Sequence, residues 1–435
     1  MNRKLIAAIG AAALLGLTAC GSDGNDGSTG SDAAPEDRSE TLTVWLMGEA
    51  DSTWPHLVEQ VNEQFAETYP NVKVNVQYQQ WGDKTTKLDA ALGGDQFPDI
   101  VELGNTETMQ YILNGALAEI DPADYENSDT WLEGLETACT ADGTQWCVPY
   151  YAGSRLGIYN AEMFEQATGS AELPQTEEEL REALDALAEE FGSDDSFSAL
   201  YLPGRYWYAA MSYVSAYGGA IAEFDEDAGE WRAALSTPEA QQGIEHFTEL
   251  VKTYNNGDQT KDEQDHGQVM ANEKSALIYG PSWEAGVIVS EENEGNPELD
   301  GKIAVAPMPG PDGQVLPTFI GGSTLGIIGK SKVQDLATDW IALFTSAESM
   351  EVLAETSTLP NNTAQLELLS GNPDMAASAA ALESSWFTPI APGWATIEQQ
   401  GVLQNMLLEV LRGTPVEEAT AEADQKIDEL INSDV

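Results

Sequence analysis

The sequence predicts an α/β protein with two lobes and a helical C-terminal region. Short apolar segments alternate with amphipathic segments along most of the chain, which is the pattern of strands joined by crossover helices. The chain has 435 residues, enough to form two hydrophobic cores. From residue 334 onward the pattern is almost entirely helical, so we expect the chain to end in helices.

The first part of this pattern opens with an apolar strand at residues 42–47. A helix is expected next, because Ser52 and Thr53 offer a capping hydroxyl and Pro55 fits a first helical turn. Strand–helix–strand repetition then predicts right-handed crossovers and a mainly parallel sheet. The remaining elements expected here are a strand at 72–78, a helix at 83–92 and a strand at 100–103.

A second set of elements follows, beginning with a strand at residues 155–159. Helices are expected at 176–191 and 238–254, and a later one at 397–411. The other strands of this set are expected at 198–202, 275–279, 303–306 and 325–328.

The N-terminus has the features of an exported lipoprotein. Lys4 precedes an apolar run at 5–17 that is too short to span a bilayer, which predicts a signal peptide over residues 1–19. The run ends in Leu-Thr-Ala-Cys-Gly, which resembles a lipobox, so Cys20 is the predicted lipidation site. The alternative is a plain signal peptide with a coincidental cysteine. Residues 20–39 are rich in Gly, Ser and Asp and predict a disordered tether to the outer face of the cell membrane.

Two further cysteines, Cys139 and Cys147, flank a turn signal at residues 141–143. A hairpin there brings the two sulfur atoms together, and in an oxidising compartment this predicts a disulfide. The alternative, a metal site, lacks further cysteine or histidine nearby, so no metal is expected.

The chain is strongly acidic, with 18 Lys and Arg against 74 Asp and Glu and a net charge of −56. Phosphate backbones would be repelled, so we expect no nucleic-acid partner. The charge does not identify a ligand, and we interpret it as a heavily solvated acidic surface.

Five segments, in this order, resemble the family 1 extracellular solute-binding proteins, the group that includes maltose- and oligosaccharide-binding receptors. The resemblance covers about residues 42–430. The segments are Leu-Thr-Val-Trp-Leu-Met-Gly-Glu at 42–49, Gly-Asp-Gln-Phe-Pro-Asp-Ile at 94–100, the run from Asp142 through Ser154 to Asn160, Lys-Ser-Ala-Leu-Ile-Tyr-Gly-Pro-Ser-Trp at 274–283, and Phe-Ile-Gly-Gly-Ser at 319–323 before Leu325.

The resemblance implies a periplasmic-binding-protein-like fold, with two α/β lobes on a multi-strand hinge. The N-terminal lobe would comprise residues 40–152 plus 323–360, and the C-terminal lobe 153–322 plus 361–435. The function implied is capture of a neutral di- or oligosaccharide by hinge closure and delivery to the transmembrane permease of an ABC importer. We expect a monomer that needs no cofactor and is not an enzyme.

A neutral sugar is recognised by aromatic planes against its apolar faces and by polar groups at its hydroxyls. Trp283 is the first candidate, because it follows the strand at 275–279 and the family places a stacking aromatic there; the alternative is a core tryptophan. Glu49, Trp81, Asn105 and Thr106 follow the first three strands and are expected at one edge of the cleft.

Other candidates lie in the second lobe and at the crossovers. Tyr206 and Trp207 are chosen from an aromatic segment, where Tyr206, Ala210, Tyr213 and Tyr217 share one helix face that is as easily core. Arg155 either donates to the sugar or pairs with a carboxylate. The remaining candidates at the crossovers and in a loop are Tyr151, Ser154, Gly321, Gly322, Ser323 and Trp394.

Several alternatives remain open. A secreted glycoside hydrolase would need two carboxyl groups at fixed separation, but no segment resembles a hydrolase motif. A receptor for a non-sugar solute would need a charged pocket with few aromatic planes. Among sugars, Trp-Gly-Asp-Lys at 81–84 and Val-Glu-Leu-Gly-Asn-Thr at 101–106 resemble receptors for chito-oligosaccharides or N-acetylglucosamine, and α-glucosides such as maltose and trehalose come second.

Overall fold

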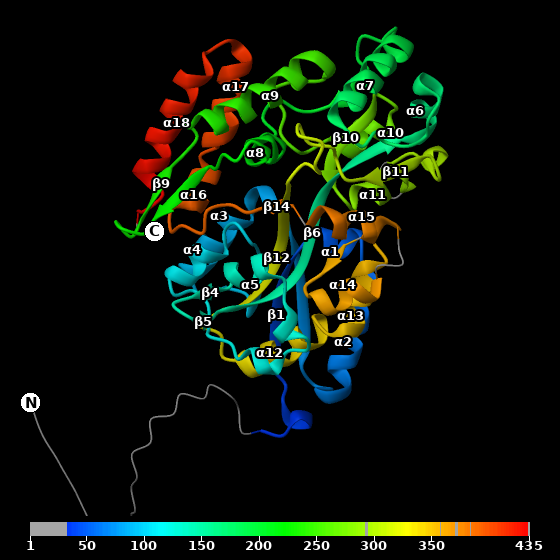
Figure 1. Cartoon of the computed structure of the whole chain (residues 1–435). Coiled ribbons are helices and arrows are strands. Elements are labelled where there is room, and N and C mark those ends of the chain that lie inside the picture. The colour runs from blue at the N-terminus through cyan, green and yellow to red at the C-terminus, as the bar shows by residue number, and fades with distance from the viewer. Residues whose placement is uncertain (1–32, 292–294, 357, 370–372, 383, 434–435) are drawn as a thin grey trace, which may run out of the picture.

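The α/β class is confirmed by a computed structural model, which describes residues 33–435 except 292–294, 357, 370–372, 383 and 434–435. Figure 1 shows two bodies of helices and strands, one above the other, joined through the strands of one sheet. The signal segment 1–19, Cys20 and much of the tether lie outside the described residues. No helix in the described part of the chain is long and apolar enough to cross a bilayer.

The central sheet has ten strands, seven of which form one path from edge to edge. Its outer strands are parallel to their neighbours, but the two strands in the middle run antiparallel to theirs. The expectation of a mainly parallel sheet is therefore wrong for the centre, because the middle strands arrive from the opposite half of the molecule and not through a crossover helix. The path runs β2 (Lys73–Gln79), β1 (Thr41–Met47), β3 (Ile100–Gly104), β12 (Thr318–Ile327), β6 (Cys147–Asn160), β10 (Ser275–Pro281) and β7 (Ser198–Tyr201).

The strands β6 and β12 cross between the two halves. All 14 residues of β6 are buried; its first part pairs with β12 and its second part with β10 and β11 (Ile303–Ala306). The sequence predicted only the later part of each crossing strand, at 155–159 and 325–328. In β12 the pair Gly321–Gly322 interrupts the apolar pattern on which the prediction rested, although the strand continues through it.

The first half packs helices around β2, β1 and β3. Its core joins α2 to α12, where Phe65, Trp340 and Phe344 are at most 1% exposed. Burial of such a side chain contributes about 1.5–3 kcal/mol. The helices of this half are α1 (Glu49–Ser52), α2 (Pro55–Thr68), α3 (Trp81–Leu92), α4 (Thr108–Leu113), α5 (Glu133–Ala138), α12 (Gln334–Phe344), α13 (Ala347–Ala354) and α14 (Thr363–Leu369).

The second half surrounds β10 and β7, and its two longest predicted helices are confirmed to within a residue. Thr176 caps α7 by accepting the N–H of Glu179, and Thr237 caps α9, whose first residue is Pro238. A small hairpin of β8 (Ala222–Asp225) and β9 (Glu230–Ala233) lies beside the C-terminal helix. The helices are α6 (Ala161–Thr168), α7 (Glu177–Phe191), α8 (Trp207–Ala216), α9 (Pro238–Tyr254), α10 (His266–Ala271) and α11 (Glu284–Val289).

The chain beyond residue 334 is helical as predicted, apart from β13 (Leu359–Pro360) and β14 (Ser385–Trp386). It continues through α15 (Pro373–Leu382) and ends with α18 (Val416–Leu430). The single helix expected at 397–411 is wrong. Two helices, α16 (Trp394–Gln399) and α17 (Val402–Arg412), meet at Gly401, whose φ of 64° is left-handed and cannot continue a helix.

The predicted disulfide is formed between Cys139 and Cys147, with their Cα atoms 5.0 Å apart. The intervening strands β4 (Thr140–Ala141) and β5 (Thr144–Gln145) pair across a turn in which Asp142 and Gly143 both have positive φ. Two such residues give the tight hairpin that brings the cysteines together. The bridge joins the end of α5 to the start of β6.

The boundaries between the two lobes stay a prediction. The proposed changes of lobe at 152/153, 322/323 and 360/361 all fall where chain segments pair with the middle of β6. Gly322 lies opposite Ala152 on one edge of β6, and Leu359 lies opposite the same residue on the other edge of that strand. The three segments thus run side by side, which is the arrangement a multi-strand hinge requires.

Candidate ligand-binding cavity

A cavity of about 630 Å³ opens between the two halves of the molecule, beside the crossing strands. The first half contributes residues that follow β1, β2 and β3. The crossing strands supply its floor, and loops and helix starts of the second half supply the opposite wall. Among the described residues, the wall includes Glu49, Trp81, Thr85, Asn105, Thr106, Glu107, Tyr151, Arg155, Tyr208, Glu263, His266, Trp283, Glu284, Phe319, Gly321, Gly322 and Glu398.

The structure brings together nine of the site residues expected from the sequence. They come from both lobes and from both crossing strands, so one cavity collects side chains that are far apart in the chain. Whether they bind a ligand stays a prediction. The nine are Glu49, Trp81, Asn105, Thr106, Tyr151, Arg155, Trp283, Gly321 and Gly322.

Trp81 forms the aromatic surface of the first half. It is the first residue of α3 and is 42% exposed. Its indole N–H donates to Glu49 at 2.8 Å, and the ammonium of Lys84 lies 4.6 Å from the ring centroid. The indole is thereby fixed by a hydrogen bond and a cation–π contact while much of its surface stays open to the cavity.

Trp283 forms the corresponding surface of the second half. It caps α11 directly after β10, where the strand ends at the cavity. Tyr151 meets the indole edge-on, with the ring centroids 6.3 Å apart and the planes at 88°. The side chain is half-buried: it belongs to the cavity wall and also packs against the core of the first half, so its contact with a ligand stays a prediction.

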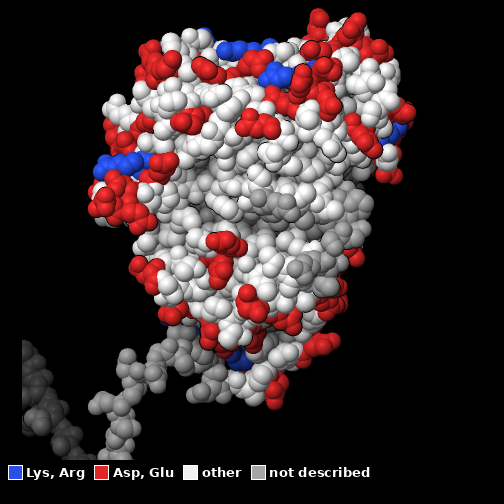
Figure 2. All heavy atoms as spheres, in the orientation of Figure 1, with Lys and Arg blue, Asp and Glu red and all other residues white. Residues whose placement is uncertain are grey.

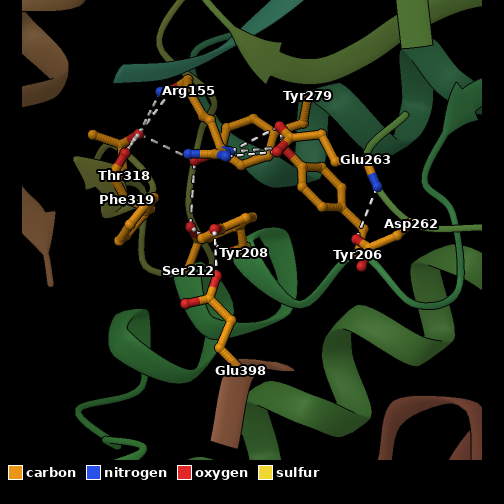
Figure 3. A network of polar contacts seen from close by, with 10 residues as sticks. All are labelled: Arg155, Tyr206, Tyr208, Ser212, Asp262, Glu263, Tyr279, Thr318, Phe319 and Glu398. Carbon is orange, nitrogen blue, oxygen red and sulfur yellow. Dashed lines mark hydrogen bonds and ion pairs between the residues drawn. The ribbon is translucent and has the colours of Figure 1, made fainter. Parts of the chain in front are cut away.

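Arg155 lies at the centre of a polar network that Figure 3 shows. Its guanidinium makes two hydrogen bonds to Glu263, of 2.9 and 2.6 Å, and Nε also donates to the Tyr206 hydroxyl at 3.0 Å. The guanidinium carbon lies 4.0 Å from the centroid of the Tyr208 ring. Burial alone would lower the pKa of Arg155, but the charge and hydrogen bond of Glu263 together with the neighbouring Tyr206 and Tyr208 outweigh it and raise that pKa. Of the two roles considered for Arg155, pairing with a carboxylate is the one observed.

Five expected site residues are not among those that line the cavity. Tyr206 and Trp207 are 0% and 2% exposed, because the start of α8 turns them into the core and Tyr208 takes the wall position. Trp394 is also 2% exposed, and its ring packs against that of Trp207 with the ring centroids 5.9 Å apart. Ser154 and Ser323 are fully buried on the crossing strands. We therefore correct the placement of these five: they lie behind the wall.

Several wall residues escaped the sequence analysis. Tyr208 directly follows the chosen candidate Trp207. Phe319 is the first residue of the motif quoted at 319–323. The loop that carries Glu263 and leads to His266, the first residue of α10, has no periodic pattern, and nothing in the sequence marks it as close to Arg155. Glu284 and Glu398 are acidic residues among 74, so composition gave no reason to choose them.

Burial shifts the protonation of three wall residues. It raises the pKa of Glu284 to about 7, an effect to which the charge of Glu263 adds, and it also raises the pKa of Glu398. It lowers the pKa of His266 to about 4. In each case the low polarity of the surroundings disfavours the charged form.

A cleft between two α/β lobes, with crossing strands as its floor, defines a solute-binding protein of the hinged, two-lobed class. The chain belongs to the bacterial extracellular solute-binding protein family, which it matches over residues 60–382. The family is extracellular, and its members and the structural neighbours of this chain are binding proteins of transport systems.

Individual relatives agree with this assignment. The diacetylchitobiose binding protein DasA of Streptomyces coelicolor is 31% identical over 95% of both chains. The GacH receptor of Streptomyces glaucescens, solved unliganded and with acarbose, has a TM-score of 0.77 at 20% identity over 92% of this chain and all of that one. A solute-binding protein of Thermotoga lettingae bound to α-D-tagatose has a TM-score of 0.77 at 23% identity, over 91% of this chain and all of that one. The similarity to these last two solved structures shows the fold alone.

Proposed function

We propose that this chain is the sugar-binding receptor of a bacterial ABC importer. The observation that carries the proposal is the pair of indoles, Trp81 and Trp283, that line one cavity from opposite halves of the molecule. An indole face packs against the apolar face of a pyranose ring, and two such faces suit two rings. The proposed ligand is therefore a di- or oligosaccharide.

The polar groups around these indoles suit hydroxyl groups. Glu49, Asn105 and Thr106 line one side of the cavity, and Gln264 and Gln399 line the other. Carboxylate and amide groups can pair with neighbouring hydroxyls, which gives a sugar its orientation as well as its affinity. A receptor for a non-sugar solute has less use for two indole surfaces and remains the weaker candidate.

Among sugars, the chito-oligosaccharide or N-acetylglucosamine class has the best support, because the most similar of the relatives described above is named for diacetylchitobiose. An α-glucoside such as maltose or trehalose is the second candidate. The acarbose-binding GacH and the maltose-bound MalE3 of T. maritima share the fold, although at only 20% identity.

Capture is proposed to occur by closure of the two lobes about the three paired segments at the middle of β6. Gly153 lies opposite Gly321 at this point, and glycine tolerates the change in backbone torsion that a hinge makes. The closed form is the one proposed to dock on the transmembrane permease subunits. The protein is further proposed to act as a monomer without cofactor or catalysis, anchored by a lipid on Cys20 to the outer face of the membrane.

Calorimetric titration of the chain from residue 20 onward, with Cys20 replaced by serine, tests the proposal. The panel contains diacetylchitobiose, longer chito-oligosaccharides, maltose, trehalose and a set of amino acids and polyamines. Saturable binding of a saccharide, together with a more compact X-ray scattering profile in its presence, is expected. Binding only to amino acids or polyamines would contradict the sugar assignment. New reducing ends released from chitin, starch or xylan oligomers would show a glycoside hydrolase instead.

A further inference from the structure

The described wall of the cavity carries far more acidic than basic groups. Five glutamates line it, and Arg155 is the one cationic side chain among the lining residues. The glutamates come from both halves of the molecule, so all of them approach a ligand held between the halves. They are Glu49, Glu107, Glu263, Glu284 and Glu398.

Two of these carboxylates form ion pairs with buried basic side chains of the protein. Arg155 Nη2 lies 2.6 Å from Glu263 Oε2, as Figure 3 shows. Lys84, which is 1% exposed, forms an ion pair with Glu107 from behind the wall. The net charge of the cavity is therefore decided by the other three carboxylates.

Those three have neutral hydrogen-bond donors as partners and form no ion pair within the described part of the chain. The backbone N–H of Gly267 donates to Glu284 at 2.7 Å. The Tyr208 hydroxyl donates to Glu398 at 3.2 Å, and the Trp81 indole donates to Glu49 at 2.8 Å. A neutral donor orients a carboxylate but leaves its charge in place.

Such an excess of negative charge is unfavourable in a cavity that closes over a neutral ligand. Closure removes water from the carboxylates, and an ion without a counter-charge resists that loss of solvation. The raised pKa of Glu284, about 7, shows that the surroundings already disfavour its charge. A ligand that carries a positive group would offset the cost.

His266 provides an independent observation on the same wall, a buried ring nitrogen without a partner among the described atoms. Its ring belongs to the cavity wall and is 3% exposed, yet Nε2 has no hydrogen-bond partner among the described atoms. Because burial lowers its pKa to about 4, the imidazole is neutral at ordinary pH and does not balance the carboxylates. When the proton is on Nδ1, Nε2 accepts a hydrogen bond, as an N–H donor requires.

The position of Glu284 connects this charge to the proposed sugar site. It follows Trp283 directly, and Gly267, which donates to its carboxylate, follows His266. Glu284 and His266 line the same cavity as the Trp283 indole, so a ring held against that indole can present a substituent to them. Resting on the sugar-receptor function proposed above, we propose that the ligand is an amino sugar with a free, protonated amine, a chitobiose-type saccharide without acetyl groups, whose ammonium group pairs with Glu284.

Three disaccharides with one backbone test this inference by calorimetry: chitobiose with free amines, diacetylchitobiose and cellobiose. Near pH 7 and at low salt, where a carboxyl with a pKa of about 7 is substantially ionised, we expect the free-amine sugar to bind about tenfold more tightly than the other two, equivalent to about 1.4 kcal/mol. Added salt should reduce this preference, because it screens the attraction between ammonium and carboxylate. Glu284→Gln should abolish the preference, whereas Glu422→Gln, an exposed residue of α18, should leave it unchanged.

The possible failures are distinguishable. Tighter binding of diacetylchitobiose than of the free-amine sugar overturns this inference and leaves the sugar receptor standing. Net proton uptake on binding of a neutral sugar, measured in two buffers of different ionisation enthalpy, also overturns it, because protons would then neutralise the carboxylates. If none of the three disaccharides and no α-glucoside binds, the proposed function fails and this inference fails with it.

Discussion

The indole of Trp283 lies directly over Gly153, near the middle of the crossing strand β6. A Cβ atom at Gly153 would stand 2.2 Å from Cζ3 of that indole, far inside van der Waals contact. The absence of a side chain at this position is therefore what lets the ring lie against the strand. A ligand stacked on Trp283 would rest, through the indole, on the strand that joins the two halves.

Gly153→Ala is expected to weaken sugar binding about tenfold, because the added methyl group forces the Trp283 indole out of its position. Overpacking of this kind costs about 1–3 kcal/mol. Titration calorimetry with the best saccharide measures the effect. The control is Gly286→Ala in α11, where a Cβ would meet nothing within 4 Å. Equal affinities for the Gly153 and Gly286 variants would show that the indole position does not matter for binding.

Two tryptophans chosen from the sequence are expected to behave in opposite ways when replaced by alanine. Trp283→Ala should cost about 1–3 kcal/mol of sugar affinity and leave the fold intact, because its indole faces the cavity. Trp394→Ala should instead cost about 3–5 kcal/mol of unfolding free energy, since its side chain is 2% exposed in the core. Denaturant unfolding and calorimetry on both variants separate the two effects. Unchanged affinity with lost stability for Trp283→Ala would identify it as a core residue.

The sequence located elements and cavity edges better than it located individual side chains. Residues that follow a strand, such as Trp81 and Asn105, were found because the carboxyl ends of parallel strands meet at one edge. Within the aromatic segment at 206–208, Tyr206 and Trp207 were chosen, whereas the residue on the cavity wall is Tyr208. The direction of each ring there depends on where α8 begins, at Trp207, which no local signal fixes. Partners such as Glu263 are 108 residues away from Arg155, so only the fold brings them together.

The ion pair between Arg155 and Glu263 is expected to support the second half of the molecule. Their side chains are 9% and 18% exposed, so Glu263→Gln leaves a buried guanidinium without its counter-charge. Loss of one partner of a buried pair costs about 3–5 kcal/mol. The control is Glu249→Gln, whose carboxylate pairs with Arg181 at the surface and is 55% exposed; it should cost at most about 1 kcal/mol. Denaturant unfolding measures the loss of unfolding free energy in both variants. Small losses of similar size would mean that water or a neighbouring side chain compensates for the missing carboxylate.

Stability should rise with salt. The net charge is −56, and Figure 2 shows acidic side chains spread over both halves of the visible face, with few basic ones between them. Salt screens their mutual repulsion, since the Debye length falls from about 10 Å at 0.1 M to about 3 Å at 1 M. The melting temperature should increase over this range of NaCl at neutral pH. The increase should shrink at acidic pH, where the carboxylates are protonated. A melting temperature that does not respond to NaCl at neutral pH would contradict the repulsion argument.

Removal of the Glu284 carboxyl should expose the pH dependence of the buried His266. The pKa of His266 is lowered to about 4 in the folded state, against about 6.5 when unfolded, so the unfolded chain binds more protons between those values. Its contribution to stability is therefore complete above about pH 6.5 and is lost as the pH falls to about 4. Glu284 has the opposite sign, because its folded pKa of about 7 exceeds its ordinary value; its contribution is present at low pH and is lost as the pH rises through about 7.

The two contributions oppose each other over the same range, so the native protein should show a weak slope there. Glu284→Gln keeps an acceptor for the Gly267 N–H but removes the titration. In that variant the unfolding free energy should rise from pH 4 to pH 6.5 by at most about 3 kcal/mol, the value for a histidine whose pKa falls from about 6.5 to about 4 on folding. The folded pKa already includes the effects of Glu263 and Asp265, which favour the charged imidazole, and of Arg155, which disfavours it. Denaturant unfolding across this range gives the slope, and His266→Gln on the same background should flatten it. A slope that survives in the double variant would assign the pH dependence to other groups.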